Sequence, residues 1–306
     1  MLTLDESYED ARVSSVRISW PPSARLVRLT GPQRIWFLQN TITTDIEGVD
    51  AGRWVESFLL EPKGKVFAHF RVGVLTDEIW LEVDSSAREL ADRLQSMRFR
   101  TKVEIEWLER TRSTVVGPGS RVFGTTGETT LDPASLIFGG TMGDVPTVDV
   151  HEQDAGAVRE LDEVPIAHPE LFEILRVEAA VPAFGVDYGT ENLPQEAGLT
   201  RAVSVEKGCY IGQETIARIH FRGHINKVVR PLTLDGVDPR PSVGRDLTLD
   251  GRKVGRITSA VESPRSGPIG LGMVAVDPAD GTALEIEGGG SAVVGAIPSG
   301  TKIKSG

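Results

Sequence analysis

The sequence predicts an α+β body followed by a small antiparallel β-barrel or sandwich. Residues 54–116 carry strands, a helix and further strands, an order typical of a sheet backed by helices. From residue 227 onward, short strand patterns alternate with Asp-Gly and Gly-Gly turn signals. Because 40% of the 306 residues are hydrophobic, the chain can bury a sizeable core. We therefore expect a domain boundary near residue 227.

The expected strands are alternating or continuous runs of apolar residues between turn signals. In the body they are the segments 25–29, 54–60, 66–74, 79–83, 103–108, 114–116 and 147–150. Beyond the boundary they are the segments 228–234, 246–249, 253–259, 269–276, 283–286 and 292–297. The second and third strands of the body form a hairpin around a turn at residues 61–65.

Capping residues and apolar stripes predict the helices. Thr30 to Gln33 is a capping-box pattern, so we expect Thr30 to cap the first helix. Ser85 or Ser86 caps the second, and Pro169 occupies the first turn of the third. The expected helices cover the segments 30–42, 86–99, 169–182 and 213–219.

One residue of the third helix breaks its apolar stripe. Leu171, Ile174 and Leu175 share one face, and the next position on that face is Glu178. Burying an unpaired carboxylate would cost several kcal/mol or shift its pKa. Either the helix end is exposed, or a cation such as Arg176 pairs with Glu178, or the carboxylate receives a polar ligand. The amino-amide edge of a heterocycle would be such a ligand.

The stretch Lys207–Glu214, which reads K-G-C-Y-I-G-Q-E, contains the only cysteine of the chain. Gly208 and Gly212 permit tight backbone geometry or the close approach of a ligand. Cys209 precedes a helix whose unpaired N–H groups, together with Lys207, favour a thiolate. The alternative is a buried cysteine that packs as a small apolar side chain.

Residues 207–230 carry a net charge of +4 in a chain of net charge −11. Five cations contribute, namely Lys207, Arg218, Arg222, Lys227 and Arg230. This excess suits an anionic ligand, although a solvated helix face would show the same composition. His220 and His224 lack further spaced ligands, so no metal site is predicted.

Composition also argues against several functions. A net charge of −11 disfavours general nucleic-acid binding. One cysteine excludes an internal disulfide framework and fits the reducing cytosol. The first residues lack the basic and apolar regions of a signal peptide, and no apolar run is long enough to span a membrane. Walker, dinucleotide-binding and G-x-S-x-G motifs are absent from the sequence.

The K-G-C-Y-I-G-Q-E stretch resembles the K-G-C-Y-x-G-Q-E signature of the YgfZ-type folate-binding proteins. These are relatives of the T-protein, the aminomethyltransferase of the glycine cleavage system. The resemblance extends over most of the chain. Its further matches are Leu29-Thr30-Gly31, Phe37-Leu38-Gln39, Thr44-Asp45, Lys63-Gly64-Lys65, Arg176-Val177-Glu178-Ala179, Ala217-Arg218 and Phe221-Arg222-Gly223.

The resemblance implies a T-protein-like body of two interleaved subdomains around a central cavity, over residues 1–226, and a β-barrel over 227–306. It implies binding of tetrahydrofolate or a one-carbon derivative, with Glu178 contacting the pterin. Together with the charge pattern, it assigns folate binding to Glu178, Arg176, Tyr210, Arg218 and Arg222. The other residues of the signature are Lys207, Gly208, Gly212, Gln213 and Glu214.

The resemblance further implies a cytosolic accessory factor in the assembly or repair of iron–sulfur clusters, with iron–sulfur proteins as partners and Cys209 as the function-linked residue. The alternative is a one-carbon transferase of the aminomethyltransferase type. The sequence departs from the T-protein where the latter has its catalytic aspartate. Ala68 and His69 occupy the matching positions, so aminomethyl transfer by that route is not expected.

Overall fold

The computed structural model describes residues 1–84 and 86–298, without the side chains of Pro22, Ala24 and Arg222. The candidate cap Ser85 and the last eight residues lie outside this description. The chain forms two compact units whose segments alternate along the sequence. The first unit comprises Met1–Leu59, Ala68–Phe172 and Glu206–Ile211. The second unit comprises Leu60–Phe67, Glu173–Val205 and Gly212–Gly306.

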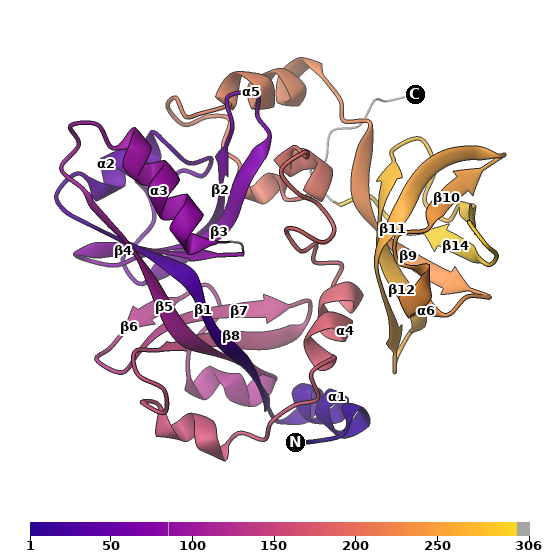
Figure 1. The fold of residues 1–306 in the computed structure, drawn as a ribbon, viewed down its shortest axis with the longest axis horizontal. Helices are drawn as coiled ribbons and strands as arrows, with labels where there is room; N and C mark the ends of the chain where they lie inside the picture. The colour runs from indigo at the N-terminus through magenta and orange to yellow at the C-terminus, as the bar shows by residue number, and fades with distance from the viewer. Residues whose placement is uncertain (85, 299–306) are drawn as a thin grey trace. The chain divides into compact units, whose positions relative to one another are not determined.

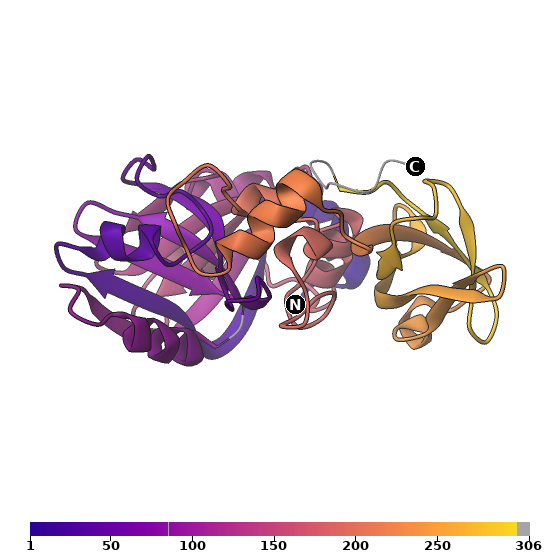
Figure 2. The same ribbon diagram turned by 90° about the horizontal axis from the view of Figure 1, so that it is seen from above.

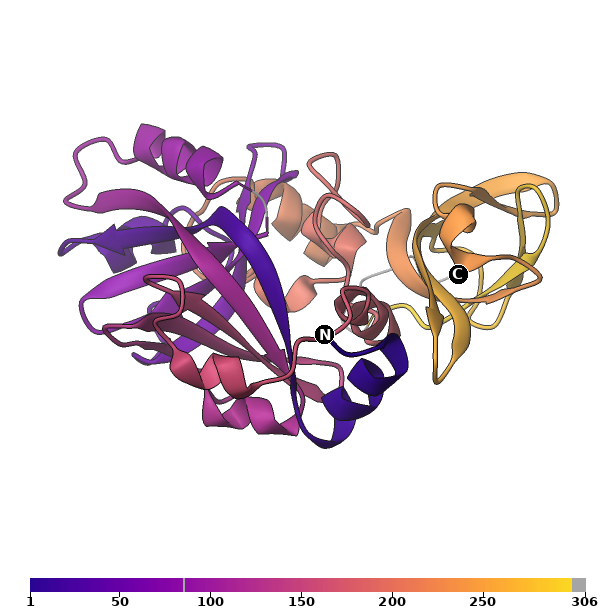
Figure 3. The ribbon, with the colours of Figure 1, turned by 60° about the horizontal axis from the view of Figure 1, so that its bottom comes forward.

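An eight-stranded sheet in the order β2-β3-β4-β1-β5-β8-β7-β6 is the main element of the first unit. Figure 3 shows the long indigo strand β1 beside the magenta strand β5, with which it pairs antiparallel. The strands are β1 Val16–Thr30, β2 Arg53–Leu60, β3 Val66–Val74, β4 Glu78–Val83, β5 Glu104–Val116, β6 Thr129–Leu131, β7 Ser135–Met142 and β8 Val145–Glu152. The sequence did not predict β6 and β7.

Short helices accompany this sheet (Figure 1). They are α1 Leu4–Val13, α2 Arg34–Gln39, α3 Ala87–Met97, and the 3₁₀ helices η1 Pro118–Val122 and η2 Arg159–Glu163. Helix α3 packs against β1 and β5. Ser86 caps it as expected, because its side chain accepts a hydrogen bond from the backbone N–H of Glu89.

The prediction that Thr30 caps a helix was wrong. Thr30 is the last residue of β1 and pairs with Glu78 on β4. Helix α2 begins only at Arg34, and no side chain caps it. The side chain of Gln33 instead accepts a hydrogen bond of 2.7 Å from the backbone N–H of Lys102. Pairing within the sheet therefore overrides the local capping pattern.

The strands predicted at 103–108 and 114–116 are one continuous strand, β5. The charged residues between them stay in the ladder because they pair with β1. Arg110 lies opposite Ser23, and Arg112 lies opposite Trp20. The register of β1 shifts on either side of Ser23, so the irregularity falls on β1 rather than on β5.

A closed six-stranded antiparallel barrel in the order β10-β11-β12-β9-β14-β13 dominates the second unit (Figure 2). Its strands are β9 Lys227–Asp235, β10 Asp246–Leu249, β11 Arg252–Ser263, β12 Gly267–Ala275, β13 Ala283–Ile286 and β14 Ser291–Val294. Each overlaps a predicted strand, and the alternative of a sandwich is excluded. Apolar side chains such as Leu247, Ile257 and Val274 fill the interior. The domain boundary expected near 227 stays a prediction.

The remaining helices precede or interrupt the barrel. They are α4 Leu171–Glu178, η3 Pro194–Ala197, η4 Thr200–Ala202, α5 Gln213–Arg222 and α6 Pro239–Ser242. Helix α4 begins two residues after Pro169 and ends at Glu178, four residues before Pro182. It ends there because Ala180 adopts a left-handed φ of 51°. Among the described residues, no helix is both long and apolar enough to cross a membrane.

Gly212 connects the start of α5 to the hairpin turn at 61–65. Its φ is 81°, and a Cβ added there would lie 2.7 Å from the carbonyl oxygen of Glu61 and 3.1 Å from Cα of Gly64. We expect Gly212→Ala to lower the free energy of unfolding by about 2 kcal/mol, because alanine meets both left-handed strain and a backbone clash. Urea unfolding measures this loss.

Gly208→Ala is the matched control, because among the described residues, apart from its chain neighbours, no atom lies within 4 Å of an added Cβ at Gly208. Its effect on stability is expected to stay within roughly 0.5 kcal/mol. Equal stability of wild type and Gly212→Ala would contradict the packing of this turn against α5.

Candidate functional site

Lys207 anchors the signature stretch within the first unit. Its side chain is buried, and Nζ donates hydrogen bonds of 2.8 Å to the carbonyl oxygens of Ile42 and Thr44. Burial lowers the pKa of Lys207 to about 8, although the carboxylates of Asp45 and Glu47 act in the opposite direction. The signature stretch is thereby fixed to the turn that follows α2.

Cys209 is exposed, whereas Lys207 and Tyr210 in the same stretch are buried. Tyr210 is buried, and burial raises the pKa of its phenol above the ordinary value. The Lys207 ammonium lies 5.4 Å from the centre of the Tyr210 ring, within cation–π range. The alternative of a buried, apolar Cys209 is therefore wrong. The thiol is presented to solvent between two immobilised side chains.

Glu178 is the last residue of α4, in the second unit, and it is half-buried. The hydroxyl of Ser263 at the end of β11 donates to its Oε1 at 2.5 Å. The same hydroxyl accepts hydrogen bonds from the backbone N–H groups of Arg265 and Ser266, at 3.1 and 2.9 Å. The Ser263 hydroxyl is thus oriented by the turn after β11, and it orients the carboxylate in turn.

One alternative predicted that Arg176 pairs with Glu178, and the structure shows other partners for Arg176. Its guanidinium donates to Oδ2 of Asp187 at 2.6 Å and to the carboxylate of Glu173. It also donates to Oγ of Ser259 on β11 at 2.6 Å. Burial acts to lower the pKa of Arg176, but the hydrogen bonds and charges of Glu173 and Asp187 outweigh it and raise the pKa.

Asp187 is fully buried and saturated with donors. Its carboxylate accepts from the hydroxyls of Thr258 and Ser259 at 2.6 and 2.7 Å, and from the backbone N–H of Ala183 at 2.9 Å. Removing one member of such a buried pair leaves an uncompensated charge, at a cost of roughly 3–5 kcal/mol. The described contacts of Arg176 therefore fix α4 to the barrel.

The cations of residues 207–230 do not form a single exposed patch. Arg230 is fully buried in the barrel, where it donates to the carbonyl oxygens of Pro278 and Gly295. Lys207 is buried in the first unit. On α5, Arg218 and Glu214 are exposed, and the side chain of Arg222 lies outside the described residues. Lys207 and Arg230 therefore make structural contacts in the interior and do not contribute to an exposed positive patch.

The sequence-predicted residues fall into two groups. Lys207, Gly208, Cys209 and Tyr210 belong to the first unit. Glu178, Arg176, Gly212, Gln213, Glu214 and Arg218 belong to the second unit. Among the residues that the structure describes, no three His, Cys, Asp or Glu side chains gather as a metal site would require.

His69 is one of the two residues, with Ala68, that the resemblance matches to the catalytic aspartate of the T-protein, and it is itself paired with a carboxylate. Its Nδ1 lies 2.7 Å from Oδ2 of Asp84, and its ring stacks on Phe58 with centres 4.7 Å apart. Burial acts to raise the pKa of Asp84, but the charge of His69 and its hydrogen bond lower it below the ordinary value. Sequence reasoning missed Asp84, because only the strand register brings it to His69.

A buried charge cluster crosses the sheet of the first unit nearby. Glu82 forms an ion pair with Arg71, and its Oε1 lies within hydrogen-bond distance of Nε2 of His151, at 2.7 Å. Asp149 accepts from Arg71 at 2.5 Å and from the hydroxyl of Thr114 at 2.5 Å. Burial opposes ionisation of Glu82, but its cationic partners hold its pKa well below the ordinary range. The cluster consists of paired charges that join β3, β4, β5 and β8.

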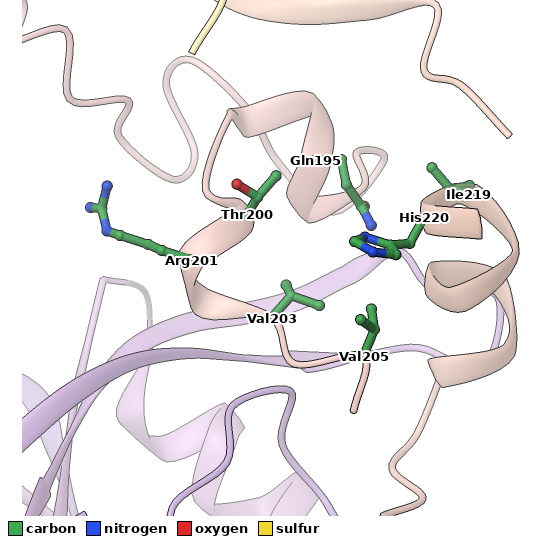
Figure 4. A pocket seen from close by; sticks show the side chains of 7 residues that line it. All are labelled: Gln195, Thr200, Arg201, Val203, Val205, Ile219 and His220. Carbon is green, nitrogen blue, oxygen red and sulfur yellow. The ribbon is translucent and has the colours of Figure 1, made fainter. Parts of the chain in front are cut away.

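The second unit also contains a pocket of about 270 Å³ that the sequence did not suggest (Figure 4). Gln195 from η3 and His220 from α5 line it, with Val203, Val205 and Ile219 as apolar walls. His220 attracted notice only as a possible metal ligand. No pattern in the sequence would have paired it with Gln195, because only the fold brings η3 and α5 to the same pocket.

Comparison with known proteins shows which proteins the chain is similar to. The model of the glycine cleavage T-protein C-terminal barrel domain matches residues 227–299. The tRNA-modifying protein YgfZ of Vibrio vulnificus strain YJ016 is 29% identical over 215 residues, which cover 66% of this chain and 65% of that protein. The YgfZ of Hamiltonella defensa is 27% identical over 272 residues, 78% of this chain and 76% of that protein.

The chain is similar to the YgfZ proteins, which are related to the T-protein. The crystal structure of the glycine cleavage system aminomethyltransferase T from Bartonella henselae matches with a TM-score of 0.85. It is 20% identical and covers 98% of this chain and 90% of that chain. The chain therefore has the T-protein-like fold that the signature implied. The matched region spans 65% of the length of the Vibrio relatives.

The lowered pKa of Lys207 predicts a pH dependence of stability. Its folded pKa of about 8 lies below the value of 10.5 for an unperturbed lysine. Between these values the unfolded chain binds more protons than the folded protein, so this residue's contribution to stability rises with pH. We expect wild type to gain stability relative to Lys207→Met between pH 8 and pH 10.

Urea unfolding of both proteins at pH 7, 8, 9 and 10 measures this gain. The variant serves as the reference for all other titrating groups. A stability difference that stays constant over this range would show that Lys207 is not desolvated in the folded protein.

Proposed function

We propose that this protein, like the YgfZ-type folate-binding proteins that it resembles, binds tetrahydrofolate, or a one-carbon derivative of it, and supports the assembly or repair of iron–sulfur clusters in other proteins. The observation that carries the folate part is the orientation of Glu178. A pterin presents an amino group beside a ring N–H, and a carboxylate accepts both hydrogen bonds at once. The hydroxyl of Ser263 donates to Oε1 of Glu178 and so orients the carboxylate.

The fold supports this proposal. The barrel model and the matching crystal structure both belong to the glycine cleavage T-protein, an enzyme whose relatives are associated with folate. Arg218, exposed on α5, is proposed to favour the anionic tail of a folate, together with Arg222. Arg176 and Tyr210, which the sequence also assigned to folate, are buried. For Arg176 we propose the role of fixing the helix that carries Glu178.

Cys209 is proposed to carry the thiol chemistry of this function. It is exposed, and Lys207 and Tyr210 hold the loop on either side of it. A single thiol cannot supply the ligands that an iron–sulfur cluster requires, so a partner chain would have to contribute the others. The YgfZ relatives are named for tRNA modification. An accessory factor whose iron–sulfur clients include tRNA-modifying enzymes would fit that name. The cytosol is its proposed location.

A one-carbon transferase of the aminomethyltransferase type is the second candidate. The His69–Asp84 pair favours it, because a histidine held by a carboxylate can act as a base where the T-protein has an acidic residue. The replacement itself argues against the same route of transfer. Turnover of tetrahydrofolate to methylene-tetrahydrofolate with an aminomethyl donor would distinguish this candidate from an accessory role.

Replacing Glu178 tests the folate part. We expect Glu178→Gln to weaken tetrahydrofolate binding by roughly 10- to 100-fold, because one of two charge-assisted hydrogen bonds becomes a clash between donors. Isothermal titration calorimetry of the full-length protein measures the affinity. Ser263→Ala, which leaves the carboxylate in place but frees its orientation, should cause a smaller loss.

Glu262→Gln is the matched control. It removes the same charge from the exposed residue beside Ser263 on β11. Its affinity should equal that of wild type. If Glu178→Gln binds tetrahydrofolate as tightly as Glu262→Gln does, Glu178 does not contact the ligand.

Cys209 is tested in cells. In a strain that lacks the native protein, Cys209→Ala should leave iron–sulfur enzyme activity at the level of the deletion, whereas wild type restores it. Since Cys209 is exposed, the variant should retain wild-type stability, and its abundance is compared by immunoblot. Full restoration by Cys209→Ala would remove the thiol from the proposed function.

A further inference from the structure

The pocket between η3, η4 and α5 of the second unit contains a buried polar group that has no partner. Gln195 is only 8% exposed. Its Oε1 is inaccessible to solvent and, within the part of the chain that the structure describes, accepts no hydrogen bond. A buried acceptor without a partner costs roughly 1–3 kcal/mol, so such groups call for an explanation. A ligand that supplies the missing donor is one.

The side chains around Gln195 define what such a ligand looks like. Figure 4 shows the Gln195 amide and the His220 ring pointing toward one another, with Val203 and Val205 on one side of them. β-Branched valines have few rotamers and present a stiff apolar wall. Arg201 also lines the pocket, but its side chain points away from Gln195 (Figure 4).

The size and charge of the pocket narrow the ligand further. No carboxylate is among its described lining residues, so it offers no counter-charge to a cation. Its volume of about 270 Å³ lies just below the range of roughly 300–1,000 Å³ that is usual for sites of drug-sized ligands. A single fused ring system fits this space better than an extended molecule does.

A primary amide recognises a neighbouring donor and acceptor as a pair. Glutamine binds adenine in this way, by donating to one ring edge atom and accepting from the adjacent amino group. Gln195 has both groups, and a rotation of the amide about its terminal bond exchanges their positions. The ligand that satisfies Gln195 therefore has an N–H donor beside an acceptor.

We propose that the Gln195 pocket is a second binding site, which takes a planar nitrogen heterocycle with an N–H donor beside an acceptor, the edge that purine bases and pterins share. The amide of Gln195 donates one hydrogen bond to this edge and accepts another from it. Val203, Val205 and Ile219 cover the ring, and His220 lies against it. This site is separate from the carboxylate of Glu178 and does not depend on the folate role proposed for that residue.

Two probes and one control compound test the proposal on the full-length protein. The probes are 9-methyladenine and 6-methylpterin, which represent the two sources of the same edge. The control is N6,N6-dimethyl-9-methyladenine, which keeps the ring but lacks the donor. Binding is followed by the imidazole Cε1–H signal of His220 in NMR spectra. The chain has five histidines, so the loss of one signal in His220→Gln assigns it.

We expect at least one probe to shift the His220 signal saturably, and the control compound to bind about tenfold more weakly or not at all. Gln195→Met, which keeps the length of the side chain but not its amide, should weaken the probe about tenfold. Val205→Phe keeps Gln195 and fills part of the pocket, so it should weaken the probe as well. Glu262→Gln, which removes an exposed charge outside the pocket, should bind the probe as wild type does. The probe that binds more tightly shows whether the ligand is a purine base or a pterin.

The proposal is overturned if neither probe shifts the His220 signal saturably, or if Gln195→Met and Val205→Phe both bind the probe as tightly as wild type. It is also overturned if Glu178→Gln weakens the probe as much as Gln195→Met does, because the pocket would then belong to the folate site. Failure of the folate proposal has a different signature, namely unchanged tetrahydrofolate affinity of Glu178→Gln in calorimetry.

Discussion

The buried ion pair between Arg176 and Asp187 is the constraint on which the second unit depends. It joins the end of α4 to the 183–187 loop and, through Thr258 and Ser259, to the middle of β11. Two charges are stable there because nearly every donor and acceptor is used. Glu178 follows Arg176 by two residues on α4, and Ser263 follows Ser259 by four residues on β11. The ion pair joins these two elements, so it also holds together the two partners of the Glu178–Ser263 hydrogen bond. A carboxylate held in this way keeps a fixed orientation, which a loosely held one would lose.

In the signature stretch, too, buried side chains with several partners hold a neighbouring residue in place. Lys207 and Tyr210 are held against the first unit, while Cys209 between them is exposed. The cost of desolvating an ammonium group is offset by two carbonyl oxygens and an aromatic ring. In a segment that merely connects two elements, a buried lysine would carry a desolvation cost without any structural benefit. The burial of Lys207 is therefore more informative about the signature than the exposure of the thiol is.

Particular elements show why some sequence predictions succeeded. The barrel strands were found because each alternates over a short run between turn signals, a pattern that depends on neighbours in sequence alone. Glu178 stood out because helical periodicity placed a carboxylate on an apolar face. Thr30 misled because a capping box and a strand end can share the same residues, and pairing with Glu78 decided between them. Arg230 looked like surface charge, yet carbonyl groups far along the chain bury it.

The sequence by itself determined the class of the fold, the barrel and the position of the signature, because periodicity, turn residues and an eight-residue motif are all local. Only the tertiary structure decided what each polar side chain contacts. It assigned Arg176 to Asp187 instead of Glu178, paired His69 with Asp84, and left the amide of Gln195 in a pocket. The physical reason is that a buried charge or amide is satisfied by whichever partner the packing of distant segments brings within about 3 Å, and spacing along the chain does not encode that distance.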